Sequence, residues 1–443
     1  MLAAIKHFLR LIMAPSLYIG GIGVILTSIF KEARWGFLLL VFLIPQPNIW
    51  HKLYSLPYGK DFIDFLFMSI VLGIFIQKKG FGKTTNSCLV MFYVIFTYLA
   101  LWNSSMNFNL PLPISFTNPQ VVNFKNYAQM MLLYFLAANV LENEEQHKLI
   151  IVIICVVILL ISVRSFRNFS GGASFDYAKR VAGPFWRVGL GANHCGAFII
   201  DYCAVLLGIL FFDHDKRRRI LILTTLLFGL HPFFFAYSRG VYMAAVVVLL
   251  FFGFFKKKSL IIMLMALLIF WQIVLPVSVV DRILMTKEKD GQIEHSAGGR
   301  LELWMMAYML FEQNPIIGVG YDGYAMTYGG TEIASGEQLS EHPDVHNFYM
   351  RALCEHGIIG LVFFLILLTS AFRSGWKLLL VAKTPFYKGL GFGFMGCVIS
   401  VAITNLFGDR WSYFVLGGYF WVLFGIVDRS IIISLEKSGK VTV

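Results

Sequence analysis

The chain has 443 residues, of which 58% are hydrophobic and 14% are charged, and its mean hydropathy is +0.72. Soluble domains are about half apolar and about a quarter charged, so this composition excludes a soluble protein and predicts lipid as the solvent. Lysine and arginine exceed aspartate and glutamate by 37 to 25, which gives a net charge of +12. Much of this excess lies in short loops beside apolar segments, as in membrane proteins. No stretch has the pattern of a nucleic-acid-binding module.

An all-α, polytopic transmembrane bundle of about 12–13 spans is predicted, because a crossing helix needs about 20 mainly apolar residues. Gly20, Gly21, Gly23 and the KEAR at 31–34 interrupt residues 11–50, so a hairpin and an interfacial segment followed by one span both fit there. The other predicted spans lie near 62–77, 87–103, 126–142, 147–164, 191–212, 219–236, 240–255, 258–277, 350–371, 386–406 and 411–427.

The spans form one integrated domain with three parts. These are an N-terminal bundle over 1–277, a large loop with short helices over 278–349, and C-terminal helices with a tail over 350–443. The N-terminal segment lacks a small-residue cleavage site after its apolar part, so we expect it to be retained. Six cysteines lie in or beside apolar segments without a CxxC pair, and we expect small buried side chains rather than disulfides or metal ligands. They are Cys88, Cys155, Cys195, Cys203, Cys354 and Cys397.

Basic loops set the orientation, because short cytoplasmic loops are enriched in lysine and arginine. The predicted inner loops are 77–83, 213–219, 255–258 and 372–377. The predicted outer segments are 104–125, 165–190, the turn at 238–239, the loop 278–349 and the GDRW at 408–411.

Four arginines on the outer side are not explained by this rule: Arg180, Arg187, Arg239 and Arg300. An arginine at membrane depth is costly and usually faces a polar cavity with a partner. Guanidinium stays charged and binds phosphate oxygens in bidentate fashion, so converging arginines could hold a diphosphate without a metal. The alternative is that each arginine snorkels to the interface or forms a structural salt bridge.

The large loop contains further candidates. Residues 300–313 place Arg300, Trp304, Ala307 and Phe311 on one face of an amphipathic helix, which Gly298–Gly299 precede and Asn314–Pro315 end. Gly318, Gly320 and Gly323 then allow a tight backbone path near a ligand.

His346 and Asn347 follow at the membrane edge. A histidine at a wet cavity mouth can accept a proton near neutral pH, although capping or bridging of the loop is the simpler interpretation. A metal site of His342, Asp344, His346 and His356 is disfavoured, because Pro343 opposes a helix there and the set has no recognisable ligand pattern.

These motifs occur in a fixed order along one face. They are Ser238–Arg239–Gly240; Arg300, Trp304 and Ala307; Asn314, Pro315, Gly318, Val319 and Gly320; and His346, Asn347, Tyr349, Glu355, Gly357, Gly360 and Leu361, with a weaker set at Arg180, Gly183 and Asn193. The set resembles the O-antigen ligase and polysaccharide polymerase family, most strongly over 238–361. The chain departs from that family in a basic turn and a full span inserted at 256–281, and its first spans do not match cleanly.

The resemblance implies a metal-independent glycosyltransferase of the bacterial inner membrane, with no cofactor and a site facing the periplasm. Its donor would be a glycan on undecaprenyl diphosphate, and its acceptor a lipid A–core sugar or a second lipid-linked glycan. Arg180, Arg239 and Arg300 would bind the diphosphate and stabilise its charge as it leaves. His346 would act as the general base on the acceptor hydroxyl, with inversion at the anomeric carbon. Residues expected to support the site are Arg187, Asn347, Trp304 and Tyr321.

Three functions remain open at this point. One dominant outer loop and moderate length favour O-antigen ligation to lipid A–core. A polymerase shares the donor chemistry, and the ten residues between Arg180 and Gly191 match a spacing seen in polymerases. Ligation of glycans to protein also fits. A transporter or flippase of lipid-linked sugars would instead have charges inside several spans and repeats of similar topology, and the sequence shows neither.

Overall fold

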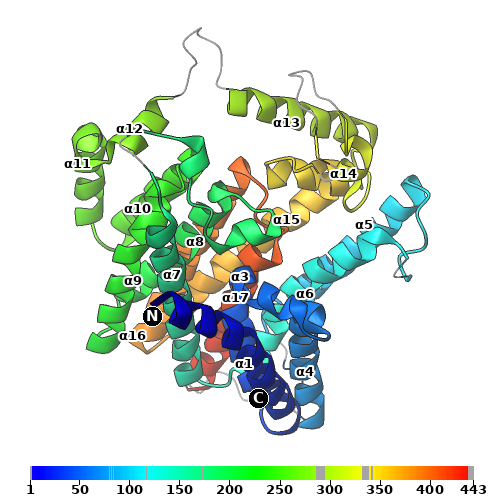
Figure 1. The fold of residues 1–443 in the computed structure, drawn as a ribbon, viewed down its shortest axis with the longest axis horizontal. Coiled ribbons are helices and arrows are strands. Elements are labelled where there is room, and N and C mark those ends of the chain that lie inside the picture. Colours follow the sequence, from blue (N-terminus) through cyan, green and yellow to red (C-terminus); the bar gives the residue numbers. More distant parts are fainter. Residues whose placement is uncertain are drawn as a thin grey trace.

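The computed structural model describes residues 2–78, 80, 82, 84–115, 117–171, 174–285, 295–331, 339–340 and 343–437, and within them every regular element is helical (Figure 1). This confirms the all-α fold class. The α-helices are α1 (Leu2–Phe30), α2 (Ala33–Leu43), α3 (Pro47–Trp50), α4 (Phe62–Ile76), α5 (Ser87–Asn107), α6 (Pro119–Val140), α7 (Glu144–Asn168), α8 (Ala192–Leu210), α9 (Lys216–Phe235), α10 (Arg239–Phe255), α11 (Ser259–Val274), α12 (Val277–Leu284), α13 (His295–Gln313), α14 (Gly323–Tyr328), α15 (Phe348–Val381), α16 (Pro385–Thr404) and α17 (Phe414–Glu436). Short 3₁₀ turns are η1 (His51–Ser55), η2 (Gly59–Asp61), η3 (Tyr177–Lys179), η4 (Gly183–Val188) and η5 (Asn405–Phe407).

Every predicted span corresponds to a helix, and residues 11–50 contain most of α1, all of α2 and the four-residue α3. Eight helices of the described chain are long and apolar enough to cross a membrane, or nine if α11 and α12, which are bent by 105°, form one span. That is fewer than the expected 12–13. Part of the difference arises because α2, α4 and α10 have 11, 15 and 17 residues, shorter than the ~20 that a crossing needs. Helix α6, with 22 residues, is long enough but not apolar enough to be among the eight. The protein is thus a multi-pass membrane protein with several shorter apolar helices.

The centre of the bundle is formed by α8, α16 and α17. Helices α8 and α16 approach so closely that a Cβ on Gly208 would lie 2.1 Å from the Cα of Gly393. Small residues permit such backbone contact in lipid, where dispersion and close packing replace the hydrophobic drive between helices. Helix α17 is buried over 89% of its span, so its uniform apolarity reflects neighbours on all sides.

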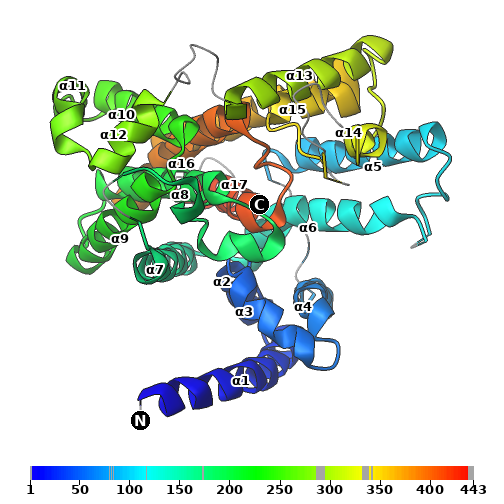
Figure 2. The ribbon, with the colours of Figure 1, turned by 45° about the horizontal axis from the view of Figure 1, so that its top comes forward.

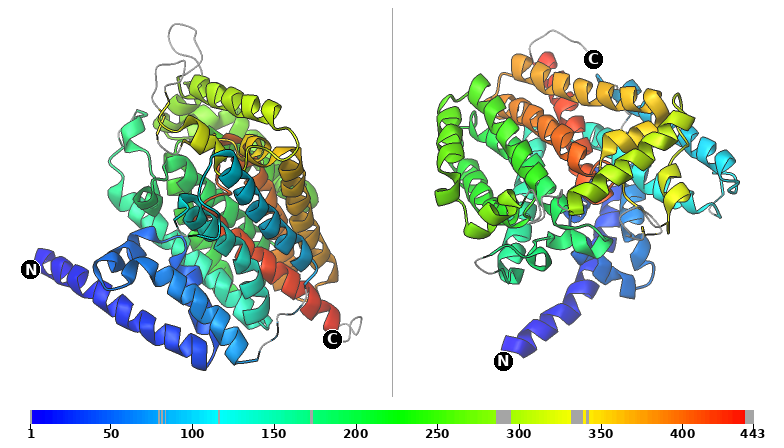
Figure 3. Two further views of the ribbon diagram at one scale, coloured as in Figure 1. Left: turned by 90° about the vertical axis from the view of Figure 1, so that its right-hand side faces the viewer. Right: turned by 90° about the horizontal axis from the view of Figure 1, so that it is seen from above.

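Helices α1 and α2 both pack against α4, and α1 leads away from the bundle (Figure 2). At the opposite extreme, α13 crosses the end of the bundle that lies away from the C-terminus (Figure 3). The long loop of 278–349 therefore contributes helices α13 and α14, with α12 at its start, to that end of the molecule.

Three predictions from the sequence differ in detail from the structure. The predicted basic loop 372–377 is helical, because α15 continues for 34 residues to Val381. Gly298 and Gly299 lie inside α13 rather than before it, since the helix begins at His295. Cys88 is exposed, whereas the other cysteines are buried or half-buried, and all six are free thiols.

Candidate functional site

A break in α15 explains much of the motif pattern at 314–361. Gly357 has φ +64 and ψ −167 inside the helix, so the carbonyls before it lose their helical partners. The carbonyls of Cys354 and Glu355 instead accept the backbone N–H groups of Val319 and Gly320, each at 2.9 Å. In the other direction, the N–H of Ile358 donates to the carbonyl of Pro315 at 2.9 Å, as buried backbone groups must find partners.

Two glycines of this segment, Gly318 and Gly320, are required by close contact with helices. Gly318 and Gly320 have φ +69 and +102, which favours glycine. A Cβ on Gly318 would lie 2.3 Å from the carbonyl carbon of Glu355, and one on Gly320 would lie 2.3 Å from the nitrogen of Ser104. The expectation of a tight path is confirmed, but the path runs between α5 and α15. It fixes α13 on the bundle.

Arg180 is held where the chain breaks between α9 and α10. Its Nε and one Nη2 hydrogen donate to the carbonyl of Ala236, at 3.0 and 2.8 Å, and Nη2 also donates to Oδ1 of Asn193 at 2.5 Å. Gly183, with φ +62, turns the intervening chain so that Asn193 reaches Arg180 from the first turn of α8. The Nη1 group, with two N–H donors, bonds to no other described residue and is available to an anion.

Arg282 lies beside Arg180, although the sequence analysis did not select it. The 105° bend between α11 and α12 turns its buried side chain inward. The guanidinium lies over the rings of Phe175 and Tyr177, at 5.1 and 5.0 Å from their centroids, and Nε donates to the carbonyl of Tyr237 at 3.4 Å. The pKa of Arg180 is lowered to about 10, chiefly by burial and then by the charges of Arg282 and Arg300, while Tyr177 and Tyr242 oppose the change. Three arginines thus repel one another here.

Arg410, in the GDRW between α16 and α17, extends this group. Its Nη1 donates to the carbonyl of Thr404 at 2.7 Å. The same Nη1 packs closely over Gly408, since a Cβ on Gly408 would lie 1.9 Å from it. Burial lowers the pKa of Arg410 to about 10; Asp201 and Asp344 act in the opposite direction, and Arg300 adds to the lowering. Arg300 is therefore close to both Arg180 and Arg410. We call Arg180, Arg282, Arg300 and Arg410 the arginine cluster.

A buried ionic network positions the segment that carries Arg410. Arg351 in α15 binds Asp409 at 2.8 Å, Glu355 at 3.1 Å and Asp322 at 3.2 Å. Burial raises the pKa of the Asp409 carboxyl, and the charge of Arg351 opposes that rise. Through Asp409, the network fixes the neighbouring Arg410 against α15.

His346 and Asp344 form a pair next to the cluster. Oδ1 of Asp344 accepts the backbone N–H of His346 at 2.9 Å, an Asx-type turn that supports φ +56 at the histidine. Oδ2 lies 3.0 Å from Nδ1 of the ring, while the side chain of His346 is 45% exposed. Burial alone would raise the pKa of Asp344, but the hydrogen bonds and charge of His346, with the charge of His194, lower it below its usual range. The ring is therefore oriented by a carboxylate and open on its other nitrogen.

The structure joins some of the predicted residues and separates others. Arg300 lies close enough to Arg180 and Arg410 for its charge to lower the pKa of both. Asp344, which contacts His346, lies close enough to oppose the lowering at Arg410. Arg239 begins α10, and its Nη1 donates to the carbonyl of Met285, which places the guanidinium at the end of α12. Arg187 is exposed, stacks on Trp186 at 4.1 Å and lies on the side of His51.

Three of the residues that were expected to support the site make contacts within the fold. Asn347 caps α15 by accepting the N–H groups of Tyr349 and Met350. Trp304 packs with Ala307 in the small core beneath α13. Tyr321 is buried against Tyr127 and Phe124. The buried face of α13 is centred on Leu303, Ala307 and Leu310, with Phe311 at its edge. The helix was therefore predicted correctly, but it is not amphipathic, because its other faces expose the large apolar side chains of Leu301, Met305, Tyr308 and Met309.

Metal ligation was disfavoured from the sequence. His342 lies outside the described residues, and His356 is buried against Phe96 and Tyr321. Within the part of the chain that is described, no group of three or more His, Cys, Asp or Glu side chains is arranged to hold a metal ion.

Arg282 and Arg410 were not among the predicted site residues, yet they share a sequence feature with the arginines that were. Arg282 and Arg410 are also positive charges at the outer ends of apolar segments, where the positive-inside rule does not account for them. Applying that criterion to every outer arginine selects both.

Comparison with known families supports the motif resemblance. Residues 224–365 match the family model described as O-Antigen ligase. Over these residues the chain is similar to O-antigen ligases. The matched region contains Arg239, Arg282, Arg300 and His346, whereas Arg180 and Arg410 lie outside it and join it only in the fold. A comparison with curated proteins finds no match. The O-antigen ligase match implies a glycosyltransferase-like membrane enzyme of O-antigen ligation or polymerisation, acting on lipid-linked glycans.

Proposed function

We propose that this protein transfers a glycan from undecaprenyl diphosphate to a sugar hydroxyl at the periplasmic face of the inner membrane. Its acceptor is lipid A–core. The observation that carries the proposal is the arginine cluster beside the Asp344–His346 pair at one end of the bundle. A diphosphate leaving group needs cations, and an attacking hydroxyl needs a base.

The cluster suits a diphosphate because its charges are already in place. Mutual repulsion and burial destabilise the charged guanidinium groups of Arg180 and Arg410, as their lowered pKa values indicate. A bound dianion relieves that repulsion, and unused N–H groups such as Nη1 of Arg180 supply bidentate contacts. Arg239, at the end of α12, is placed to contact the same lipid-linked substrate at the rim.

The reaction is a direct displacement with inversion. His346 accepts the proton of the acceptor hydroxyl through the ring nitrogen that does not face Asp344, and the hydroxyl oxygen forms the new bond to the anomeric carbon. The bond from that carbon to the phosphate oxygen breaks with its electron pair. Undecaprenyl diphosphate leaves as an anion, and the arginine cluster stabilises the charge that develops on it. The guanidinium groups thus supply the charge stabilisation that metal ions provide in other transferases.

The test replaces each cluster arginine by glutamine in a strain that lacks the chromosomal gene. Removal of one donor to a developing oxyanion lowers rates by about 10²–10³-fold, so surface glycan should fall sharply for Arg300→Gln and Arg410→Gln. Arg217→Gln is the matched control, since Arg217 is exposed at the start of α9. Wild-type glycan levels in all four cluster variants, with normal membrane expression, would exclude this site.

The same strain identifies the acceptor. Loss of a ligase leaves long chains on the lipid carrier, and loss of a polymerase leaves single repeat units on the core. We assign ligation because the outer part of the chain is dominated by the 278–349 region. Single repeat units on the core of the deletion strain would reassign the protein to polymerisation without changing the donor site.

A further inference from the structure

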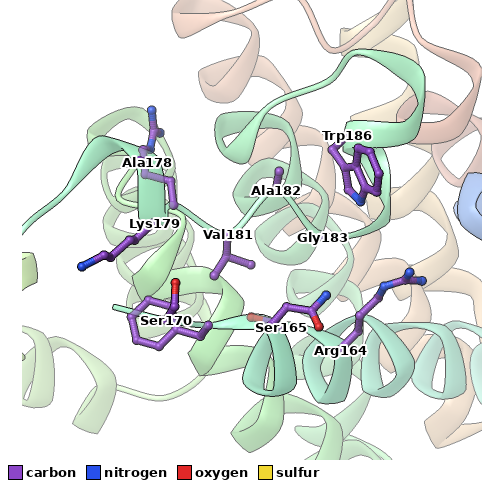
Figure 4. A pocket seen from close by; sticks show the side chains of 12 residues that line it. Arg164, Ser165, Ser170, Ala178, Lys179, Val181, Ala182, Gly183 and Trp186 are labelled. Carbon is purple, nitrogen blue, oxygen red and sulfur yellow. The ribbon is translucent and has the colours of Figure 1, made fainter. Parts of the chain in front are cut away.

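A cavity lies on the outer side of α7, apart from His346. It opens between the C-terminal end of α7 and the stretch 178–186, with a volume of about 190 Å³ (Figure 4). One water needs only ~15 Å³ of such space, so the cavity admits a group of several atoms, such as a sugar ring. Its wall includes Arg180, the same residue that faces the arginine cluster.

The cavity is cationic. Arg164 and Lys179 line it together with Arg180. No hydrogen bond or ion pair joins Arg164 to another described residue, whereas Lys179 lies 3.5 Å from Asp176, with both of those side chains about two-fifths exposed. Such an exposed pair contributes little and exchanges readily with solvent. The half-buried Arg164 therefore offers its full set of donors to an anion.

The other lining groups are typical of carbohydrate contacts. Trp186 is 51% exposed, and its indole ring lies on the same side of the cavity as Arg164 (Figure 4). Arg187 covers one face of the ring, 4.1 Å from its centroid, so a sugar would stack on the other face. Asn168 adds an exposed amide at the rim. An apolar ring face with amide and guanidinium donors around it recognises a ring that has a flat C–H face and polar edges.

We propose that this cavity binds a negatively charged sugar residue, one carrying a carboxylate or a phosphate, of a glycan whose reacting end lies at the arginine cluster. The proposal rests on the proposed function for the glycan itself. Arg164 pairs with the anionic group, Trp186 stacks on the ring, and Arg180 separates this subsite from the diphosphate. Selection of the glycan would therefore lie in the 164–186 region, outside the matched family segment.

Binding is measured without turnover by saturation-transfer NMR on the full-length protein in detergent. The probes are glucuronate and glucose 6-phosphate, with glucose as the neutral comparison. Wild type should saturate both anionic sugars, and Arg164→Gln should weaken them by about tenfold, the value of one charged hydrogen bond. Trp186→Ala should weaken them as well. Arg167→Gln is the matched control: it removes the same charge three residues away, from an exposed side chain that does not line the cavity.

Two results would overturn the subsite: no saturation of either anionic sugar by wild type, or equal saturation by wild type and Arg164→Gln. A different result would contradict the proposed function and leave the subsite intact. In that case the protein transfers no glycan in any assay, while Arg300→Gln still binds the anionic sugars.

A photo-crosslinking amino acid at position 178, whose alanine lines the cavity, distinguishes the two sources of the sugar. Captured glycan that mild acid releases from its lipid comes from the donor, and captured glycan attached to lipid A comes from the acceptor. Either product supports the subsite. Absence of any glycan adduct from expressed, photolysed protein contradicts it.

Discussion

Replacing Asp344 by asparagine tests how the candidate base is oriented. In the native chain one carboxylate accepts two N–H groups of His346, the backbone N–H at 2.9 Å and, 3.0 Å away, Nδ1–H of the ring. This leaves the lone pair on Nε2, the nitrogen that does not face Asp344. Asparagine has a single acceptor oxygen. If it keeps the backbone bond, its NH₂ faces Nδ1 and selects the tautomer that is protonated on Nε2, which cannot act as a base.

The expected magnitude follows from these two bonds. If the amide rotates to accept from Nδ1–H, the backbone N–H of His346 loses its acceptor, at a cost of about 1–3 kcal/mol, and the φ +56 conformation loses its support. Either outcome removes most of the general-base contribution, so glycan transfer should fall by about 10²–10⁴-fold.

Transfer is measured with membranes that contain the variant and lipid-linked donor, with products separated on gels. Glu312→Gln, on the exposed side of α13, is the control for loss of an outer carboxylate. Expression and thermal unfolding of both variants show whether the fold is retained. If Asp344→Asn transfers glycan within about threefold of wild type, the orientation of His346 by this carboxylate is not part of the mechanism.

Three further changes test the framework. Gly357→Ala should destabilise the protein by at least about 1–3 kcal/mol in thermal unfolding, because φ is +64 and the new Cβ would lie 2.3 Å from Ile316 backbone; an unchanged melting temperature would contradict the kink. Arg351→Met should cost about 3–5 kcal/mol by leaving buried carboxylates unpaired, and a stability equal to wild type would show that the network is dispensable. Arg239→Gln should reduce transfer less than Arg300→Gln in the same gel assay, since its guanidinium lies at the end of α12; a larger loss would place it at the diphosphate.

The pH dependence of unfolding offers a separate check on Asp344. Its pKa is lower in the folded chain than the ordinary value, so the pair stabilises the fold above about pH 4. This contribution should be lost as the pH falls further, toward the folded pKa. Asp344→Asn should therefore show a shallower loss of stability below about pH 4, and identical profiles would contradict the shift.

The sequence by itself determined the helical membrane fold, the order of the helices and the similarity of residues 224–365 to O-antigen ligases. Apolar length alone identifies a crossing helix, because lipid forces every backbone hydrogen bond to be made within the segment. Local rules also placed the end of α13 at Asn314–Pro315 and the cap of α15 at Asn347. The apolar runs of the sequence did not distinguish full spans from the shorter helices α2, α4 and α10, because an apolar run does not show where its helix ends.

Only the tertiary structure decided which arginines belong together. The four arginines of the cluster come from four separate segments. The bend after α11 places Arg282, and the break between α9 and α10 holds Arg180. The Arg351 network places Arg410 through the neighbouring Asp409. Sequence spacing contains no information on such contacts, because the distances between helix ends are set by how the bundle packs. For the same reason the sequence could not tell that Arg187 stacks on Trp186 or that Arg239 contacts the end of α12, the helix that carries Arg282.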